Sequence, residues 1–270
     1  MAEHIAFIGG GNMASAIISG LLRGGTPREL VHVVEPFADT RARLLADFGI
    51  AAQPQASDDL AHASVLIWAV KPQTFKEAAN QVRGMAAQSL HLSVAAGIPS
   101  QSIAAWLGNE RVIRTMPNTP ALIGKGITAL FARDAASAAD RALAERIMRT
   151  TGDILWVDHE AQLNAVTALS GSGPAYMFYF MEAMTTAGTE MGLSAAQAYQ
   201  LAVATFIGAG DLARNSNDPP QLLRERVTSK GGTTYAAITS MDASHVKAHF
   251  IEAMHAAGRR AQELGEEFGK

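Results

Sequence analysis

Cysteine is absent from the 270 residues, which excludes disulfides, a thiol nucleophile and thiolate metal ligands. Charged residues make up only 17%, and the formal net charge of −3 gives no electrostatic basis for binding nucleic acid or an anionic membrane. The most apolar segment, 175–181, ends at Glu182, well short of the roughly 20 residues that a membrane helix needs. We therefore expect a soluble, cytoplasmic protein without nucleic-acid or membrane partners.

Signals for targeting and metal binding are also missing. The first apolar run begins directly after Glu3 and His4 and breaks at three glycines, unlike a signal peptide. His245 and His249 are four residues apart, but the glutamate of a zinc-protease motif does not lie between them. The sequence therefore predicts no metal site.

The first half alternates short apolar runs with helical patterns. The predicted strands are 5–9, 30–35, 65–70, 90–95 and 111–116, with 127–132 and 154–157 as candidates that extend the sheet. The helical segments between them include 39–48, 73–85 and 100–107. This alternation predicts an α/β fold with a doubly wound, Rossmann-type parallel sheet, in a dinucleotide-binding domain over residues 1–158.

After about His159 strand-like runs cease, which predicts an all-helical domain over residues 159–270. Helix starts are marked by Gly173-Pro174, by a capping box of Ser194 with Gln197, and by Pro219-Pro220. In the segment 176–191 apolar side chains occur on nearly all sides, so this helix has to be buried on most sides. We expect a second copy of the chain to cover it, in a homodimer or higher homo-oligomer; burial within the chain's own domains is the alternative.

The most informative segment is the glycine turn after residue 8. It places strand, turn and helix in the arrangement that holds a dinucleotide pyrophosphate at a helix N-terminus. Gly9 permits the tight turn, and Gly11 lets the backbone approach a phosphate with no Cβ in the way. The segment lacks the Gly-Lys-Ser/Thr ending of a nucleoside triphosphate loop. The predicted contacts of NADPH or NADH here are Ile8, Gly9, Gly10, Gly11, Asn12 and Met13.

Ligands of a doubly wound sheet bind beyond the carboxyl ends of its strands. Glu35 follows the second strand, where an acid can accept hydrogen bonds from the ribose and repel a 2′-phosphate, which favours NADH. Arg41 and Arg43 follow shortly and can instead meet such a phosphate. Lys71 can face phosphate, ribose or solvent, and Asn118 can recognise a carboxamide or satisfy its own turn. The further predicted cofactor residues are Ala69, Val70, Lys71, Pro72, Ala95, Ala96, Gly97, Pro117 and Asn118.

A second polar patch, residues 228–234, precedes the helical run 235–239. Hydroxyls and glycines ahead of a helix expose N–H groups beside the positive end of its dipole. This predicts a site for a small carboxylate, with a plain helix cap as the alternative. Residues 170–174 are similar, but they first indicate a kinked join between two helices.

Six stretches resemble the delta-1-pyrroline-5-carboxylate reductase family, whose members catalyse the last step of proline synthesis. They are Phe7-Ile8-Gly9-Gly10-Gly11-Asn12-Met13, Ala69-Val70-Lys71-Pro72, Val94-Ala95-Ala96-Gly97, Met116-Pro117-Asn118-Thr119-Pro120, Ser170-Gly171-Ser172-Gly173-Pro174-Ala175-Tyr176 and Ser229-Lys230-Gly231-Gly232-Thr233-Thr234. They run in the family's order across nearly the whole chain. Many dehydrogenases share the glycine turn, whereas the last two motifs are specific.

The resemblance implies reduction of 1-pyrroline-5-carboxylate to L-proline by NADPH or NADH, and a helical domain that interleaves with a partner's in a dimer. It implies that Thr234, as the catalytic residue, reaches the imine nitrogen, and it aligns Glu160 with a family acid near cofactor or substrate. The residues implied to hold the substrate are Ser229, Gly231, Gly232, Thr233, Thr234 and Glu160. Two residues depart from the family pattern: Lys230 replaces a common Pro, and Glu35 replaces a hydroxyl residue that suits the NADP phosphate.

Two other functions remain open at this point. A beta-hydroxyacid dehydrogenase shares the glycine-rich start and helical tail, and it would use Lys230 as acid and base. A non-catalytic nucleotide sensor would bind the cofactor and turn over no imine.

Overall fold

The computed structural model describes residues 3–270, which form two compact units. One contains residues 3–172 together with Ala257–Lys270, and the other is Gly173–Ala256. α6 (Gln162–Val166) belongs to the same compact unit as the sheet. The domain boundary predicted after residue 158 stays a prediction. Within residues 3–270, none of the helices is long and apolar enough to span a bilayer.

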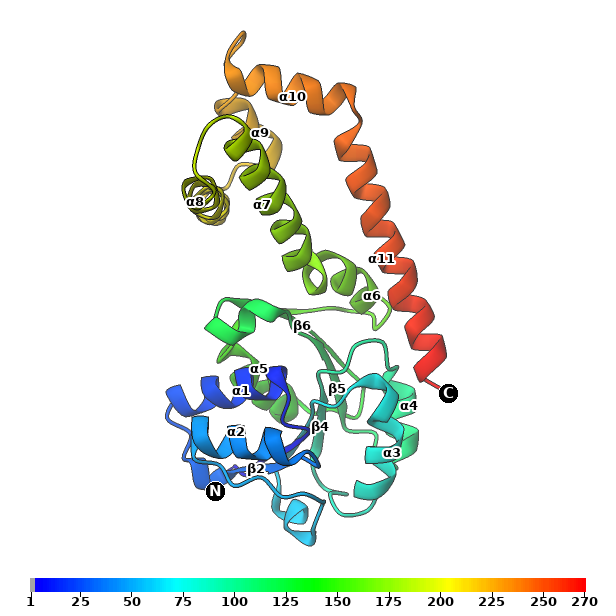
Figure 1. Ribbon diagram of the computed structural model, residues 1–270. Coiled ribbons are helices and arrows are strands. Elements are labelled where there is room, and N and C mark those ends of the chain that lie inside the picture. Colours follow the sequence, from blue (N-terminus) through cyan, green and yellow to red (C-terminus); the bar gives the residue numbers. More distant parts are fainter. Residues whose placement is uncertain (1–2) are drawn as a thin grey trace. The chain divides into compact units, whose positions relative to one another are not determined.

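The first unit is built on one sheet whose strands stand, within residues 3–270, in the order β2-β1-β3-β4-β5-β6-β7 (Figure 1). The strands are β1 (Ile5–Ile8), β2 (Val31–Val34), β3 (Val65–Trp68), β4 (Leu90–Ser93), β5 (Val112–Met116), β6 (Gly126–Ala132) and β7 (Gly152–Trp156). β1 pairs in parallel with both β2 and β3, so the direction of winding reverses between β1 and β3. Crevices beyond the carboxyl ends of such strands are where open α/β sheets bind ligands.

The predicted strands are confirmed, and both candidates extend the sheet. The sheet is not parallel throughout, however, because β6 runs antiparallel to β5, with Met116 opposite Ala129. Their link contains only the 3₁₀ turn Thr119–Ile123, and a parallel crossover needs about a dozen residues or more. β7 follows the helix α5 (Ala138–Arg149) and pairs in parallel with β6.

Helices cover both faces of the sheet, and alternate residues of β1 divide between them. Ile5 and Phe7 belong to a core with α1, α2 and α5, whereas Ala6 and Ile8 belong to a core with α3 and α4. These helices are α1 (Asn12–Arg23), α2 (Ala38–Phe48), α3 (Pro72–Val82) and α4 (Ser100–Leu107). Because β1 is buried on both faces, its carboxyl end and the turn that follows are held rigidly.

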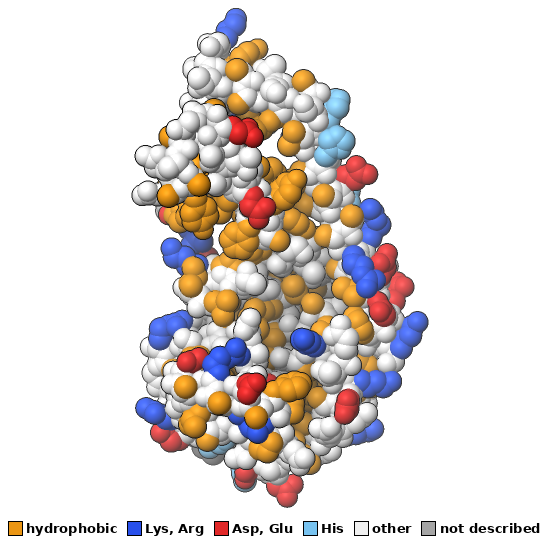
Figure 2. Space-filling model, viewed as in Figure 1, with side chains coloured by type: hydrophobic (Ala, Val, Ile, Leu, Met, Phe, Trp, Pro, Cys, Tyr) orange, Lys and Arg blue, Asp and Glu red, His pale blue; other side chains and the backbone are white. Residues whose placement is uncertain are grey.

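The second unit is helical, as predicted. It contains α7 (Gly173–Glu190), α8 (Ala195–Arg214), α9 (Pro220–Arg226), α10 (Thr233–Ala243) and the first part of α11 (Val246–Phe268). The capping box of Ser194 and Gln197 is present at α8. Along α7 and α8 large apolar side chains lie in the open, with Phe178 59% and Tyr179 69% exposed, and Figure 2 shows such side chains at the surface of this unit.

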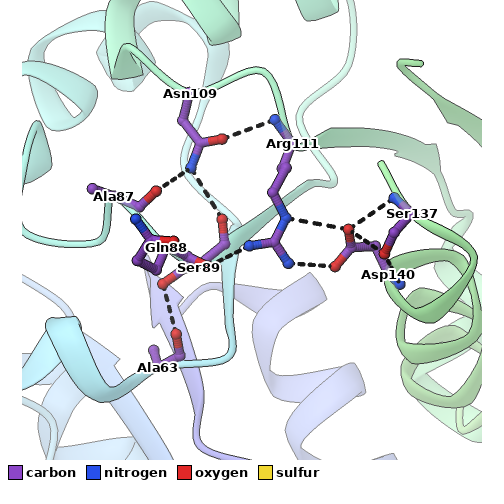
Figure 3. Close-up of polar contacts among 8 residues, drawn as sticks. All are labelled: Ala63, Ala87, Gln88, Ser89, Asn109, Arg111, Ser137 and Asp140. Atoms are coloured by element: carbon purple, nitrogen blue, oxygen red, sulfur yellow. Dashed lines mark hydrogen bonds and ion pairs between the residues drawn. The ribbon is translucent and has the colours of Figure 1, made fainter. Parts of the chain in front are cut away.

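A polar network joins the amino ends of β4 and β5 to α5 (Figure 3). Arg111 donates from Nη2 to Asp140 Oδ1 at 2.6 Å and from Nε to Oδ2 at 3.2 Å. Asp140 also closes a capping box with Ser137 at the start of α5. Burial alone would raise the pKa of Asp140, but hydrogen bonds from Arg111 and Ser137 outweigh it and hold the pKa below its usual value. This network lies at the amino ends of the strands. It therefore stabilises the end of the sheet opposite the glycine turn, which follows the carboxyl end of β1.

His91 makes the stability of the sheet depend on pH. Its ring is buried in β4 and its Nδ1 accepts a hydrogen bond from Trp68 Nε1 at 3.1 Å. Burial, with nearby Arg111, lowers the pKa of His91 from 6.5 to about 4. The unfolded chain therefore binds a proton between these values while the folded chain does not, so stability falls as pH falls through this range. We expect His91 to account for a loss of about 3 kcal/mol between pH 7 and pH 4.

Urea denaturation at a series of pH values checks this expectation. His91→Gln keeps an acceptor for the Trp68 indole and does not titrate, so its stability should fall less steeply below pH 6.5. Parallel curves for both proteins would show that another group carries the dependence.

Candidate active site

The glycine turn joins β1 to α1 with the geometry that its sequence predicts. Gly9 has φ +95°, and a Cβ there would lie 2.7 Å from the carbonyl oxygen of Ala69 and 3.1 Å from Val70 Cγ1. The turn therefore packs directly on the end of β3, and Gly9, Ala69 and Val70 lie together. A Cβ on Gly11, in contrast, would meet no protein atom within 4 Å. The space beside Gly11 is therefore open, as close approach of a ligand to the backbone requires.

The start of α1 suits an anion. Gly11 is its N-cap, the N-cap carries no side-chain hydrogen bond, and the first turn contains no acid. The first N–H groups of a helix have no partner within the helix, and they lie at the positive end of its dipole. Open space beside Gly11, N–H groups without helical partners and a first turn without an acid together fit a dinucleotide pyrophosphate.

Glu35 points into the protein. Its Oε2 accepts from Gly10 N at 2.8 Å, its Oε1 accepts from Phe37 N at 2.9 Å, and the residue is only 5% exposed. The carboxylate thus ties the glycine turn to the loop between β2 and α2. Its predicted contact with the ribose stays a prediction, and the structure adds a bracing role that sequence reasoning missed.

An exposed lysine follows β3, whereas small and more buried residues follow β4. Lys71 is exposed and is the N-cap of α3, with Pro72 in its first turn. Ala95 is buried and Ala96 half-buried. Gly97 has φ +81°, and a Cβ there would lie 3.2 Å from Leu264 Cβ. Gly97 therefore packs closely against α11, and its predicted contact with the cofactor stays a prediction.

Asn118 holds the loop after β5 in place. Its Nδ2 donates to the carbonyl of Ser170 at 3.2 Å, and its Oδ1 accepts from Ile127 N at 3.0 Å. Pro117 beside it is buried, and a Cβ on Gly171 would lie 2.5 Å from Met116 Cε. Asn118 thus bonds to backbone groups of other segments and not of its own turn, and its predicted contact with the cofactor stays a prediction. Residues 167–171 form a π-helical segment, which explains the kink expected there.

Glu160 is half-buried and lies in an ionic cluster around the buried Arg114 of the first unit. Its Oε1 accepts from Arg114 Nη1 and from Ser100 N, both at 2.6 Å, and its Oε2 accepts from Ser100 Oγ at 2.6 Å. Burial alone would raise the pKa of Glu160, but these hydrogen bonds outweigh it and lower the pKa. Glu160 thus caps α4 and neutralises Arg114. Its role as a substrate ligand stays a prediction.

Arg114 is the residue of this cluster that sequence reasoning missed. It is 7% exposed and lies inside the apolar strand β5. A single charged residue in a buried strand needs a partner of opposite charge, since an unpaired buried charge is costly. That signal was present in the sequence and points to a buried carboxylate.

The second predicted ligand region, residues 228–234, lies in the helical unit. Gly232 is the N-cap of α10, the N-cap again carries no side-chain hydrogen bond, and the first turn again contains no acid. Gly231 has φ +76°, a conformation that glycine adopts readily. Thr233 is exposed, Thr234 is half-buried, and both stand in the first turn, while Ser229 and Lys230 are exposed in the loop before it. This helix start suits a carboxylate for the same reasons that α1 suits a phosphate.

The glycine turn and the acid-free start of α1, at the switch point of a doubly wound sheet, indicate the class of protein. The sheet domain is that of a nicotinamide-dependent oxidoreductase, followed by a helical C-terminal region.

Comparisons with known proteins define the class more narrowly. The family model "Pyrroline-5-carboxylate reductase dimerisation" matches residues 160–264, and "NADP oxidoreductase coenzyme F420-dependent" matches residues 4–97. A pyrroline-5-carboxylate reductase of Pseudomonas aeruginosa is 43% identical over 99% of this chain and 98% of its own. The chain belongs to the pyrroline-5-carboxylate reductase family.

Solved structures agree with this assignment. A pyrroline-5-carboxylate reductase from Coxiella burnetii superposes with a TM-score of 0.90 at 36% identity, covering 98% of this chain and 99% of its own. The enzyme of Plasmodium falciparum, solved with NADP bound, superposes with a TM-score of 0.87 at 25% identity, covering 97% and 98%. The predicted family and the predicted class of fold are thereby confirmed.

Proposed function

We propose that this chain reduces 1-pyrroline-5-carboxylate to L-proline with NAD(P)H, in the cytoplasm, as the last step of proline biosynthesis. The observation that carries the proposal is the uncapped, acid-free start of α10, formed by the family-specific segment 229–234. Membership of the reductase family supports it, and it speaks against a hydroxyacid dehydrogenase and a nucleotide sensor.

The cofactor contacts follow from the glycine turn. The N–H groups at the start of α1 would hold the pyrophosphate, and Gly9, Ala69 and Val70 would form the wall beneath it. The dinucleotide, when bound, supplies the hydride for the reaction.

The substrate contacts follow from α10. Its first N–H groups, with Ser229 and Thr233, would bind the carboxylate of the ring, which orients C5 for hydride addition. Negative charge moves onto the imine nitrogen as the hydride arrives at C5, and the nitrogen takes one proton to give the secondary amine. A hydroxyl positioned at this nitrogen, which we assign to Thr234, stabilises the developing charge. Solvent or the protonated substrate supplies the proton.

We also propose that two copies of the chain assemble through their helical units, in a homodimer or a larger homo-oligomer. A monomer leaves Phe178, Tyr199 and Leu201 exposed, at 59%, 60% and 56%. Apolar surface of this extent on a protein that stays in solution is typical of an interface between subunits.

Replacing Thr234 tests the catalytic proposal. We expect Thr234→Ala to keep its affinity for NADPH and to lose about tenfold or more in kcat, the loss typical of one positioned donor or acid. The measurement is the decrease of reduced-nicotinamide absorbance with the cyclic imine as substrate. Thr239→Ala, on the same helix but exposed beyond its first turn, is the matched control. An unchanged kcat in Thr234→Ala would remove this hydroxyl from the mechanism.

A wild-type protein that binds NADPH but reduces no cyclic imine would overturn the proposed reaction. Turnover of a hydroxyacid with Lys230 essential would instead establish the dehydrogenase.

A further inference from the structure

We infer that the last turns of α11, residues 264–269, position the loop 95–99 for the nicotinamide end of the cofactor. Leu264, Gly265 and Phe268 are then positioning residues of the reaction, although they lie far from the loop in the sequence. The inference rests on the proposed function, since it concerns the cofactor of the same reaction.

The loop 95–99 directly follows β4, at the carboxyl end of the strand. A dinucleotide bound at the switch point of a doubly wound sheet lies with its two halves on opposite sides of that point. With the pyrophosphate at α1, the adenosine half would lie over β2 and the nicotinamide half over β4. The predicted cofactor residues of this loop, Ala95, Ala96 and Gly97, would therefore meet the nicotinamide half, and their position would affect hydride transfer.

The backbone of this loop is in close contact with α11. A Cβ on Gly97 would lie 3.2 Å from Leu264 Cβ, and a Cβ on Gly265 would lie 3.0 Å from the carbonyl oxygen of Gly97. About one turn further along the chain, a Cβ on Gly269 would lie 2.8 Å from Pro99 Cδ. A methyl group on any of these glycines would have to displace the loop or the helix. The position of the loop therefore depends on that of α11.

The end of α11 is itself fixed to α3 and α4. Ser102 of α4 donates from Oγ to the carbonyl oxygen of Gly269 at 2.5 Å. Lys76 of α3 donates from Nζ to the carbonyl oxygen of Lys270 at 3.0 Å. Phe268 packs against the core that these two helices form on one face of the sheet. Figure 1 shows this end of α11 beside α4, so the helix is a firm support for the loop.

The loop is also held at both of its own ends. Val94, the residue before it, donates from N to the carbonyl oxygen of Trp68 at 3.1 Å. Ser100, the residue after it, donates from N and from Oγ to Glu160, both at 2.6 Å. Because these two residues are fixed, a displacement caused at α11 has to be taken up within residues 95–99, where the nicotinamide half would lie.

Gly265 separates this positioning role from a contribution to folding. Glycine inside a helix destabilises it relative to alanine, so Gly265→Ala should strengthen α11 while its methyl group pushes on the Gly97 carbonyl. Gly258 lies about two turns earlier, on the same side of α11. A Cβ there would lie 3.9 Å from Ala168 Cβ, an ordinary contact. Gly258→Ala is therefore the matched control.

Calorimetric titration of the full-length protein compares NADPH with 2′-phospho-ADP-ribose, which is the same molecule without its nicotinamide. We expect Gly265→Ala to bind NADPH at least about threefold more weakly, and 2′-phospho-ADP-ribose within about twofold of the wild type. Its kcat with the cyclic imine should fall about fivefold or more, because displaced reactants lose rate steeply. Gly258→Ala should match the wild type in all three measurements, and thermal denaturation should show no loss of stability in either variant.

Phe268→Ala and Phe268→Leu provide a second test of the same support. Alanine removes the contact between the helix end and the core, whereas leucine keeps most of its apolar surface. We expect Phe268→Ala to weaken the binding of NADPH more than that of 2′-phospho-ADP-ribose. Phe268→Leu should recover most of this difference.

Three results would overturn the inference. They are an NADPH affinity of Gly265→Ala equal to that of Gly258→Ala, an equal loss for NADPH and 2′-phospho-ADP-ribose, and a loss that follows a decrease in stability. Failure of the inference is distinct from failure of the proposed function. Imine reduction by the wild type, with kcat and NADPH affinity unchanged in Gly265→Ala, contradicts the inference alone. Selective weakening of NADPH binding in Gly265→Ala, with no imine reduced by the wild type, contradicts the reaction alone.

Discussion

Gly11→Val is expected to weaken NADPH binding by roughly a hundredfold or more while the protein still folds. A Cβ at this position would meet no protein atom within 4 Å, so we expect the valine to clash chiefly with what binds there. Gly11 has φ −69° and ψ −170°, an extended conformation that any residue adopts. Loss of glycine at the N-cap costs the helix about 1 kcal/mol or less. Calorimetric titration with NADPH and a thermal denaturation curve measure the two effects separately.

Gly11→Ala and Gly9→Ala make the experiment specific. A single methyl at residue 11 occupies less of the open space, so its effect on binding should lie between those of glycine and valine. A methyl at residue 9 would lie 2.7 Å from the Ala69 carbonyl oxygen, and φ there is +95°, so this variant should lose stability even without ligand. Wild-type affinity for NADPH in Gly11→Val would place the pyrophosphate elsewhere.

The geometry of the glycine turn could be predicted because the role that we propose for it is carried by the backbone. Gly9 and Gly11 matter because they have no Cβ, and the neighbouring strand and helix are evident from local periodicity. The start of α10 is similar, since Gly232 and the threonines after it mark a helix beginning. At both helix starts the local sequence is enough to predict the backbone geometry.

The roles of Glu35, Asn118 and Glu160 could not be predicted in the same way. Each is a polar side chain at a strand end or loop, and the sequence places it near the ligand crevice. Whether such a side chain points to a ligand or to the backbone depends on unpaired N–H and C=O groups brought there by distant segments. Gly10 N meets Glu35 across 25 residues, and Ser170 O meets Asn118 across 52. Local sequence patterns do not predict such contacts between distant segments.

The direction of β6 shows the same limit at the level of topology. Residues 126–132 are mostly apolar, as is typical of a strand covered on both faces, so the pattern favours a parallel strand. The direction is decided instead by the length of the preceding link. Asn118 then fastens the start of the antiparallel strand by accepting from Ile127 N.

Removal of the Glu160 carboxylate is expected to lower the free energy of unfolding more than any other substitution proposed above. Arg114 is 7% exposed, and Glu160 neutralises it at 2.6 Å while also accepting from Ser100 N and Oγ. Glu160→Ala leaves a buried guanidinium without its partner, a change that costs about 3–5 kcal/mol. Since whole domains are stable by about 5–15 kcal/mol, this variant should unfold at a much lower urea concentration.

The double variant Arg114→Met with Glu160→Ala separates a structural from a substrate-binding role. Removing both charges eliminates the unpaired guanidinium, so most of the lost stability should return. If Glu160 instead binds the imine substrate, KM should rise in the single and double variants alike, with stability little changed in either. The pH dependence gives a further check, because the lowered pKa of Glu160 means that its contribution is present at neutral pH and lost as pH falls through that lowered value. Stability of Glu160→Ala equal to that of the wild type at neutral pH would show that the ionic cluster contributes nothing to folding.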